Sequence, residues 1–342
     1  MNLNYYMILF CIFFIFFIAL TELFKKKNLL LDRVSSEKHK SFAIKTSTPL
    51  TGGIFLIFFF AFFLAEKNFF LIVFLLLIFF NGLLSDVNYL NNPKIRFLIQ
   101  LIFVFFAIYS LDLRVFGIGI NIIDYYLYNY KYLNYIFTIF CLLILVNGFN
   151  FIDGLNTLSL GYFIGVLLSL AFVENRYDYN FELLKNNFSV IFLVVLFALI
   201  LKGYLFLGDS GSYILGFFLG VKILFISRNF PEISAWYFAL LLWYPSFEIL
   251  FSIIRKSFSK QSAFKPDNEH LHQRIFKKLK NKMPYEIANP VSANLINFYN
   301  IISIFIGSLN IFDTKKIIFI IFINIIFYIF IFNRFNKLNE KN

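Results

Sequence analysis

Apolar runs close to the length of a membrane-spanning helix recur along the whole chain. A helix needs about 20 mostly apolar residues to cross the hydrocarbon core of a bilayer. Runs of this kind predict about eleven spans, at residues 5–24, 52–66, 69–85, 96–112, 132–150, 155–174, 188–206, 211–227, 235–254, 293–312 and 316–333. Because backbone polar groups in lipid must be satisfied internally, we expect an all-α, polytopic membrane bundle, with residues 1–342 forming one integral membrane domain.

The composition excludes a soluble globular domain. Hydrophobic residues make up 60% of the chain and charged residues 15%, whereas soluble domains have about 45–50% and about 25%. The two cysteines, Cys11 and Cys141, both lie in apolar runs, so that neither a disulfide framework nor a metal cluster is expected. The remaining class is a membrane protein.

The net charge of +12 is distributed unevenly over the predicted loops. If the N-terminus is outside, 22 of the 31 Lys and Arg residues lie in inner segments and eight lie in outer loops. Cytoplasmic loops carry the excess of Lys and Arg, so the count favours an N-terminus outside and a C-terminus inside. Lys25, Lys26 and Lys27 directly follow the first apolar run, which we interpret as a span and not as a signal peptide.

Polar residues gather in five segments that this topology places on the inner, cytoplasmic face: residues 25–51, 86–96, 147–157, 202–211 and 255–292. In the first, Gly52 and Gly53 predict a tight helix start, where backbone N–H groups and Lys45 are placed to meet a phosphate or a uracil carbonyl. In the second, Asp86 closes a span. Taken alone, the first feature is more often a basic loop that ends in a turn, and the second is more often a solvated helix end.

The third and fourth segments have more specific patterns. Asn147, Asn150 and Asp153 are spaced three residues apart, which places them on one face of a helix, and Gly154 allows the backbone to approach a ligand closely. In the fourth, Asp209 stands between glycines at the start of the next span. A carboxylate there suits a hard cation and the phosphate oxygens that it bridges. The simpler interpretation is an Asp that caps the helix.

The fifth segment contains His270, His272 and Arg274. A His-X-His pair could ligate zinc, but no Cys or further His lies near it in the sequence, so contact with an anionic group is the better interpretation. A solvated basic loop remains the alternative. The preceding span carries Glu248, and an ionisable residue within a span is a candidate for function or for packing.

Together the five segments indicate phosphoryl transfer. Carboxylates recruit Mg²⁺, while Lys and Arg hold phosphates. Catalysis of phosphoryl transfer is mostly the positioning of groups and the neutralisation of charge, which is what such a set of side chains can supply.

At this point the sequence resembles the polyprenyl-phosphate N-acetylhexosamine-1-phosphate transferases of glycosyltransferase family 4. The resemblance runs through nearly the whole chain in order: Lys45, Thr48-Pro49 and Gly52-Gly53; Gly82, Asp86, Arg96 and Gln100; Asn147, Asn150 and Asp153-Gly154; Phe206, Gly208-Asp209 and Gly211-Ser212; Pro266-Asp267 and His270-Leu271-His272. Pro245 to Glu248 followed by Arg255-Lys256 is similar to the branch that transfers N-acetylglucosamine 1-phosphate.

The resemblance implies a reaction and its partners. The family transfers the sugar 1-phosphate of a UDP-N-acetylhexosamine to undecaprenyl (polyprenyl) phosphate, releases UMP and requires Mg²⁺, with Mn²⁺ as an alternative. It acts in the bacterial inner membrane, with its active site on the cytoplasmic face, and starts the synthesis of cell-envelope polysaccharides. The expected partners are these two substrates and the lipid bilayer, with a homodimer left open and no nucleic acid.

The resemblance also implies roles for individual residues. Asp86 and Asp209 would be catalytic, with Asp209 holding the metal and Asp86 beside the lipid phosphate. The substrate-binding residues would be Lys45, Asn147, Asn150, Asp153, Gly154, His270, His272 and Arg274.

Three residues depart from the family pattern. Ser85 replaces the first Asp of a pair, Asn156 replaces a second Asp, and Gln273 replaces a second His. These departures leave open the interpretation that the chain is a catalytically silent member of the family. A transporter or flippase of anionic lipid-linked sugars is the other alternative, and it would show inverted repeats with polar groups near the bilayer midplane.

Overall fold

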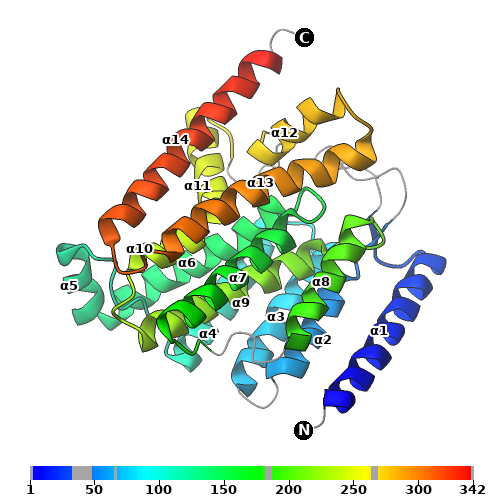
Figure 1. The fold of residues 1–342 in the computed structure, drawn as a ribbon, viewed down its shortest axis with the longest axis horizontal. Helices are drawn as coiled ribbons and strands as arrows, with labels where there is room; N and C mark the ends of the chain where they lie inside the picture. Colours follow the sequence, from blue (N-terminus) through cyan, green and yellow to red (C-terminus); the bar gives the residue numbers. More distant parts are fainter. Residues whose placement is uncertain (1–2, 33–47, 65–67, 182–186, 263–268, 340–342) are drawn as a thin grey trace.

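A computed structural model describes the chain except for residues 1–2, 33–47, 65–67, 182–186, 263–268 and 340–342 (Figure 1). The described part is almost wholly helical: α1 Leu3–Lys26, α2 Gly52–Leu64, α3 Phe69–Asp86, α4 Pro93–Leu111, α5 Asn121–Asn129, α6 Lys131–Ile152, α7 Leu158–Tyr177, α8 Asn187–Leu201, α9 Gly208–Asn229, α10 Ala235–Leu241, α11 Trp243–Phe258, α12 Leu271–Lys280, α13 Tyr285–Ser308 and α14 Thr314–Asn339. Two short strands, β1 Leu31–Asp32 and β2 Thr48–Pro49, pair antiparallel. The prediction of an all-α fold is confirmed.

Within the described residues, seven helices are long and apolar enough to cross a membrane: Phe69–Asp86, Pro93–Leu111, Lys131–Ile152, Leu158–Tyr177, Gly208–Asn229, Tyr285–Ser308 and Thr314–Phe335. A bent pair, α10 with α11, raises the number to eight if it forms one span, and two shorter apolar helices lie at Gly52–Phe62 and Val190–Leu201. Each predicted run overlaps a helix or a helix pair, but length and hydropathy identify seven to eight spans. By these helices the chain is a multi-pass membrane protein.

The run 235–254 is not the straight span that its hydropathy predicts. It is divided at Leu242 into α10 and α11, whose axes differ by 76°. Pro245 explains the break, because in a continuous helix its ring would clash with the carbonyl group of Leu241 and its missing N–H would leave that group unbonded. In the first turn of a new helix neither problem arises.

Three of the predicted loops are shorter than expected. Residues 147–152 belong to the last turns of α6, and α9 already begins at Gly208. Between residues 255 and 292 the chain is mostly helical, since α11 continues to Phe258, α12 follows, and α13 begins at Tyr285. At the start of α12 the Gln273 side chain accepts a hydrogen bond from the His270 N–H at 3.2 Å, which satisfies an N–H group at the helix terminus.

Helix α9 forms the centre of the bundle. All residues from Ser210 to Val221 are buried. A Cβ atom on Gly216 would lie 2.6 Å from the Leu145 carbonyl oxygen of α6, so α6 and α9 approach at the level of their backbones. Close packing of this kind holds helices together in lipid, where the hydrophobic effect contributes little between them.

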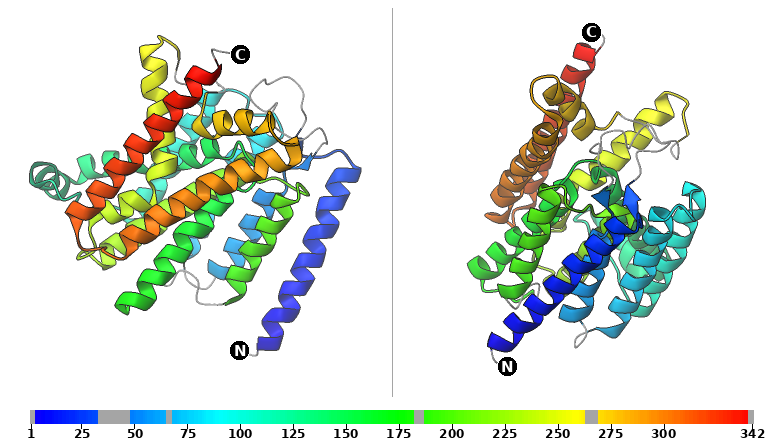
Figure 2. Two further views of the ribbon diagram at one scale, coloured as in Figure 1. Left: turned by 45° about the horizontal axis from the view of Figure 1, so that its top comes forward. Right: turned by 90° about the vertical axis from the view of Figure 1, so that its right-hand side faces the viewer.

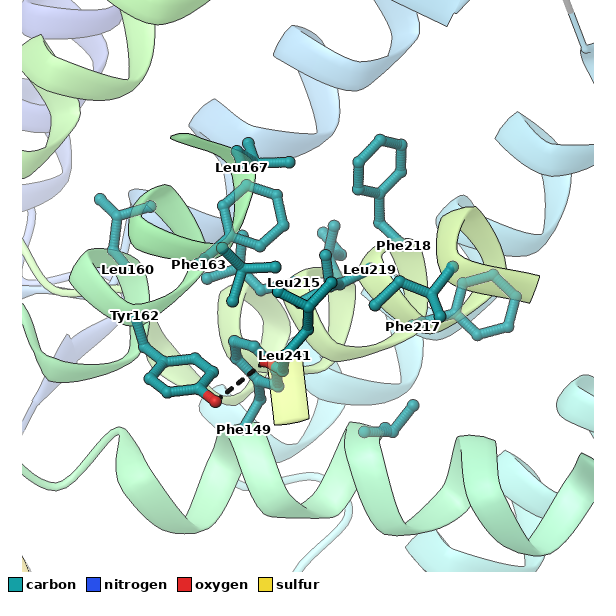
Figure 3. Packing of buried hydrophobic residues seen from close by; sticks show 14 of the residues in the cluster. Phe149, Leu160, Tyr162, Phe163, Leu167, Leu215, Phe217, Phe218, Leu219 and Leu241 are labelled. Carbon is teal, nitrogen blue, oxygen red and sulfur yellow. Dashed lines mark hydrogen bonds between the residues drawn. The ribbon is translucent and has the colours of Figure 1, made fainter. Parts of the chain in front are cut away.

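Apolar side chains of α6, α7 and α9 complete this core, as Figure 3 shows. The rings of Phe163 (α7) and Phe218 (α9) have centroids 6.1 Å apart. The Tyr162 hydroxyl donates a hydrogen bond to the Leu241 carbonyl oxygen at 2.9 Å, which satisfies the end of α10 inside the core (Figure 3). The result is a rigid centre from which the ends of α3, α6 and α9 project.

The outer surface of the bundle is strongly apolar. On α4 and α14, exposed side chains include Phe105, Phe106, Phe319, Phe322 and Phe330. An apolar surface of this extent is typical of contact with lipid. Helices α1 and α14 lie at opposite edges of the bundle, and the start of α1 and the end of α14 lie at its opposite ends (Figures 1 and 2).

The close contact between α6 and α9 predicts a stability effect. Gly216→Val would force a side chain into the backbone of Leu145 and Val146, which cannot move aside as a flexible side chain can. We expect the protein to lose about 1–3 kcal/mol of stability. Thermal unfolding of the purified protein in detergent measures this loss. Gly117→Ala is the control, since its new Cβ would meet no atom closer than 3.6 Å; equal melting temperatures for both variants would contradict the packing described.

Candidate active site around Asp209

The ends of four helices meet at the start of α9. Helix α3 ends with Ser85 and Asp86, α4 carries Arg96 in its first turn, and α6 carries Asn150 in its last. Asp209 is the second residue of α9 and directly follows Gly208, whose φ is +72°. A side chain at position 208 would be strained by this angle and would also place a Cβ 2.7 Å from the Asp86 carboxylate.

The buried carboxylate of Asp86 caps helix α9. Its Oδ1 accepts a hydrogen bond from the Asp209 N–H at 2.8 Å. Its Oδ2 accepts from the N–H and the hydroxyl of Ser210 at 3.1 and 2.7 Å. These are N–H groups of the first helical turn, which have no partner inside the helix and which favour a negative charge. Asp86 therefore fixes the start of α9, while its predicted place beside a lipid phosphate stays a prediction.

The Asp209 carboxylate gathers the other polar groups. Its Oδ2 accepts hydrogen bonds from the Ser85 hydroxyl at 2.6 Å and from the Arg96 guanidinium at 2.7 Å. Its Oδ1 accepts from the Asn150 amide at 2.9 Å, and the same amide lies 3.1 Å from the Ser212 hydroxyl. The structure thus brings together Asn150 and Asp209, which belong to separate polar segments of the sequence. Asp209 does not cap α9 itself, because Asp86 does.

The ion pair between Arg96 and Asp209 is open to solvent on one side. The two side chains are 23% and 16% exposed. Arg96 also donates a hydrogen bond to the Ser85 hydroxyl. A guanidinium in this position can pair with a phosphate as readily as with a carboxylate, since both present oxygen atoms to its fork of N–H donors.

The donor set at Asp209 fits a magnesium ion. The Asp209 carboxylate and the Ser85 hydroxyl supply oxygen atoms, which are the ligands that Mg²⁺ prefers, whereas Asn150 presents its NH₂ group to Asp209. Across the described residues there is no cluster of three His, Cys, Asp or Glu side chains that could hold a metal alone.

Asn147 belongs to a separate buried network. Its amide donates to the Gln100 side chain at 2.9 Å and to the Leu143 carbonyl oxygen at 2.9 Å. Gln100 in turn donates to Asn81 at 3.4 Å. Although Asn147 lies on the same helix as Asn150, it holds α6 against α4, and its predicted contact with substrate stays a prediction.

The turn after α6 lies against the fifth predicted segment. Asp153 caps α6, and Gly154 lies so close to His272 that a Cβ there would be 2.7 Å from its Nε2. Helix α13 holds this turn, because Asn289 accepts a hydrogen bond from the Asn156 N–H at 2.8 Å. Asn156 is thus bound through its backbone, whatever its side chain does.

His270 and His272 stack on each other at the start of α12. Their ring centroids are 5.5 Å apart with an interplanar angle of 11°, and His270 also lies 5.2 Å from the Phe151 ring. His272 is fully buried, and neither of its ring nitrogens has a hydrogen-bond partner among the described residues. Burial lowers the pKa of His272 to about 3, so the ring is neutral.

Arg274 contacts Glu269 and helix α14. Its guanidinium lies 3.8 Å from the centre of the Phe332 ring of α14 and pairs with Glu269. These contacts attach α12 to α14. The predicted role of Arg274 in substrate binding is not tested by them and stays a prediction.

One sequence prediction about the first segment is wrong. The N–H groups of Gly52 and Gly53 donate to the carbonyl oxygens of Phe206 and Leu207 at 2.9 and 3.1 Å. They therefore hold the start of α2 against the segment before α9 and are not available to a phosphate. Lys45 lies outside the described residues.

Sequence reasoning did not select Arg96 and Ser212 as site residues. Arg96 follows Pro93 in the first turn of α4, and Ser212 follows Asp209 by three residues, which puts both within reach of the same carboxylate once the helices pack. The signal for Arg96 was its cationic side chain at the start of an otherwise apolar span, where a charge is costly unless it has a partner.

Comparison with known proteins identifies relatives of the chain. Residues 68–227, which include Ser85, Asp86, Arg96, Asn150 and Asp209, match the model of glycosyl transferase family 4. The chain is 28% identical over 267 residues to the undecaprenyl-phosphate alpha-N-acetylglucosaminyl 1-phosphate transferase of Thermotoga maritima, covering 77% of this chain and 79% of that protein.

Two further relatives have related names. The probable undecaprenyl-phosphate N-acetylglucosaminyl 1-phosphate transferase of Bacillus subtilis is 26% identical over 249 residues, or 70% of this chain and 66% of that protein. The decaprenyl-phosphate N-acetylglucosaminephosphotransferase of Mycobacterium tuberculosis is 29% identical over 154 residues, or 38% of each chain.

The cap on α9 predicts a large effect of Asp86→Ala. The substitution leaves two N–H groups and one hydroxyl without their acceptor, and each unsatisfied buried group costs about 1–3 kcal/mol. We expect a loss of more than about 2 kcal/mol of stability, measured by thermal unfolding. Asp112→Ala removes a half-exposed carboxylate at the other end of α4 and should cost less than about 1 kcal/mol. A smaller loss for Asp86→Ala than for Asp112→Ala would refute the cap.

Buried His272 predicts a pH dependence of stability. Its folded-state pKa of about 3 lies below the value of 6.5 for an ordinary histidine, so unfolding takes up a proton between these values. This residue should therefore reduce stability by about 1.4 kcal/mol for each pH unit below 6.5. His272→Asn removes the titrating ring, and its melting temperature should fall less steeply with pH than that of the wild type. Parallel curves for the two proteins would exclude the effect.

Proposed function

We propose that this chain is a member of glycosyl transferase family 4, whose model its residues 68–227 match, and that it transfers a sugar 1-phosphate from a UDP-N-acetylhexosamine to undecaprenyl phosphate and releases UMP. The observation that carries the proposal is the Asp209 carboxylate of α9, toward which α3, α4 and α6 direct a hydroxyl, a guanidinium and an amide. Such a group of charged and polar side chains at the ends of apolar helices suits a reaction between a water-soluble diphosphate and a membrane-bound phosphate.

The relatives support the choice of substrates. Two of them are named for undecaprenyl phosphate, one for decaprenyl phosphate, and all three for N-acetylglucosamine. We therefore propose N-acetylglucosamine as the first sugar to test. The product, a sugar linked to the lipid through a diphosphate, would start the assembly of a cell-envelope polysaccharide.

The proposed reaction is a direct displacement. An oxygen of the lipid phosphate attacks the β-phosphorus of the nucleotide sugar, the bond from that phosphorus to the bridging oxygen breaks, and UMP leaves with this oxygen. A phosphate monoester has a second pKa of about 6, so most of the acceptor is already a dianion at neutral pH and needs little deprotonation. Ser85 in place of a carboxylate is compatible with this route, because no protein base has to act.

Arg96 and Asp209 have complementary roles in the proposal. Arg96 would leave Asp209 in part and pair with phosphate oxygens, which offsets the charge of the two substrates. Asp209, with the Ser85 hydroxyl beside it, would hold Mg²⁺, which when bound neutralises charge on the diphosphate, while Asn150 would orient the Asp209 carboxylate. Asp86 would keep Asp209 beside Ser85, Arg96 and Asn150, because its hydrogen bonds fix the start of α9.

We also propose that the chain crosses the membrane eleven times, with its N-terminus outside, its C-terminus inside, and the Asp209 site on the cytoplasmic face of a bacterial inner membrane. The start of α1 and the end of α14 at opposite ends of the bundle support an odd number of crossings (Figures 1 and 2). Cysteines placed at exposed Tyr128 and Lys280, in a chain without Cys11 and Cys141, should label from the outside and the inside respectively. Labelling of both from one side would disprove the topology.

A transporter is the less favoured alternative. Its coupling residues would lie in broken helices near the bilayer midplane. Here Ser85, Arg96, Asn150 and Asp209 all lie in the first or last turns of their helices.

The assay for the proposal follows UMP release by purified protein with undecaprenyl phosphate, Mg²⁺ and a panel of UDP-N-acetylhexosamines. We expect UMP with at least one sugar, and only when the lipid phosphate is present. Absence of UMP with every sugar would reject the transferase and would favour a silent family member.

Two substitutions predict the roles of individual residues in this assay. Asp209→Asn keeps the size of the side chain but removes its charge, and should lower the rate by at least about 10²-fold. Ser85→Asp restores a second carboxylate beside Asp209 and should bind Mn²⁺ more tightly, which paramagnetic resonance of the ion can measure independently of turnover. Asp112→Asn, remote from the site, serves as the control for both. Full activity of Asp209→Asn would remove Asp209 from the proposed chemistry.

A further inference from the structure

Glu248 is a buried carboxylate that the proposed reaction does not use. It lies in α11, and only 1% of it is exposed. The break before α11 and a close contact with α6 set its position, because a Cβ on Gly148 would lie 2.5 Å from the Pro245 carbonyl oxygen. The first turn of α11 is thus packed against the part of α6 that leads to Asn150. A buried charge in such a place is costly unless specific partners satisfy it.

Its partners lie at the start of α12. Glu248 Oε1 is 3.0 Å from His270 Nδ1 and accepts a hydrogen bond from the Leu271 N–H at 3.1 Å. His270 is itself buried, with 4% exposed. One oxygen atom therefore holds both the ring of His270 and the first free N–H of the helix that follows. The hydroxyl groups of Tyr244 and Tyr328 lie close to the same carboxylate.

This geometry decides where the proton of His270 lies. Oε1 acts as an acceptor toward the Leu271 N–H, and an ionised carboxylate has no proton to donate. Nδ1 of His270 must then supply the hydrogen atom of its contact with Oε1. In a neutral imidazole this puts the proton on Nδ1 and the lone pair on Nε2. A carboxylate that orients a functional histidine through Nδ1 is a common arrangement in metal sites and in catalysis.

The orientation of His270 affects the rest of the segment. Its ring stacks on His272 and contacts Phe151 of α6, and His272 lies directly against Gly154. The stacked rings of His270 and His272 thus connect the Glu248 carboxylate to the turn after α6. A change at Glu248 would move these rings relative to the residues that follow Asn150.

We propose that Glu248 is a positioning residue, which fixes the Nδ1–H tautomer and the orientation of His270 and thereby sets how the start of α12 lies against the turn at residues 153–154. We call the contacts of Glu248 with His270 and Leu271 the clamp. Its effect on substrate rests on the proposed function: if the chain is a sugar-1-phosphate transferase, the clamp shapes the binding site of the nucleotide sugar and not that of the lipid. The tautomer itself is independent of that function.

The small number of histidines allows a direct measurement. The chain has three, His39, His270 and His272, so ¹⁵N-labelled histidine in the full-length protein in nanodiscs gives few ring signals. Chemical shifts distinguish a protonated from a bare ring nitrogen, and His39→Gln and His272→Asn assign the signals. We expect His270 in the wild type to carry its proton on Nδ1. In Glu248→Ala the signals should shift toward the Nε2–H tautomer.

Two matched variants distinguish the orientation of the His270 ring from the charge of Glu248 and from a general disturbance of the structure. Glu248→Gln keeps an oxygen acceptor, and should keep the Nδ1–H tautomer. Glu269→Gln removes the charge of a neighbouring carboxylate that pairs with Arg274, and should leave the His270 signals in place. A wild-type His270 protonated on Nε2, or unchanged signals in Glu248→Ala, would overturn the proposal. The wild-type spectrum alone decides this if Glu248→Ala does not fold.

Kinetics test the consequence for the substrate. Glu248→Ala should raise KM for the UDP-sugar about tenfold while KM for undecaprenyl phosphate stays within about twofold, and Glu248→Gln should restore most of the loss. An equal rise in both KM values would refute the assignment to the nucleotide sugar. If the wild type forms no UMP, the proposed function fails, but the spectra still test the clamp.

Discussion

The contact between the end of α3 and the start of α9 determines where the polar groups of this protein lie. The Asp86 carboxylate takes up the free N–H groups of the first turn of α9. This is possible only because Gly208 places no side chain between them. In a bundle held together largely by close packing, buried hydrogen bonds of this kind favour one register between the two helices over its neighbours, because a shifted register would leave these groups unpaired.

From that register follows the arrangement around Asp209. Its carboxylate is presented beside Ser85, Arg96 and Asn150, each in the terminal turn of a different helix. Terminal turns are where polar side chains can avoid the apolar part of a bilayer and still be held rigidly. The same principle applies at α12, where Glu248 holds a second set of polar groups through the backbone and ring of residues 270–271.

Much of the fold could be predicted from hydropathy, because long apolar runs have few alternatives to a helix in lipid. That Asn150 and Asp209 both belong to a polar site could be expected from the resemblance, but their contact could not. The cap by Asp86 could not, since an Asp at a helix end looks the same in sequence whether it contacts solvent or another helix. The break at Leu242 has a signal in the sequence, since Pro245 cannot bond to the Leu241 carbonyl group, although the angle of 76° does not follow from it. The helix within residues 255–292 could not be seen, because a short amphipathic segment becomes a helix here only by packing against distant elements.

The central claim is that the Asp209 site transfers a whole sugar 1-phosphate, not a sugar alone. The most direct measurement uses a UDP-N-acetylhexosamine that carries a radioactive β-phosphate. If the account is correct, the label moves into the lipid fraction together with the sugar, and the released nucleotide is unlabelled UMP. Label that stays in a released UDP while the sugar enters the lipid would contradict the account.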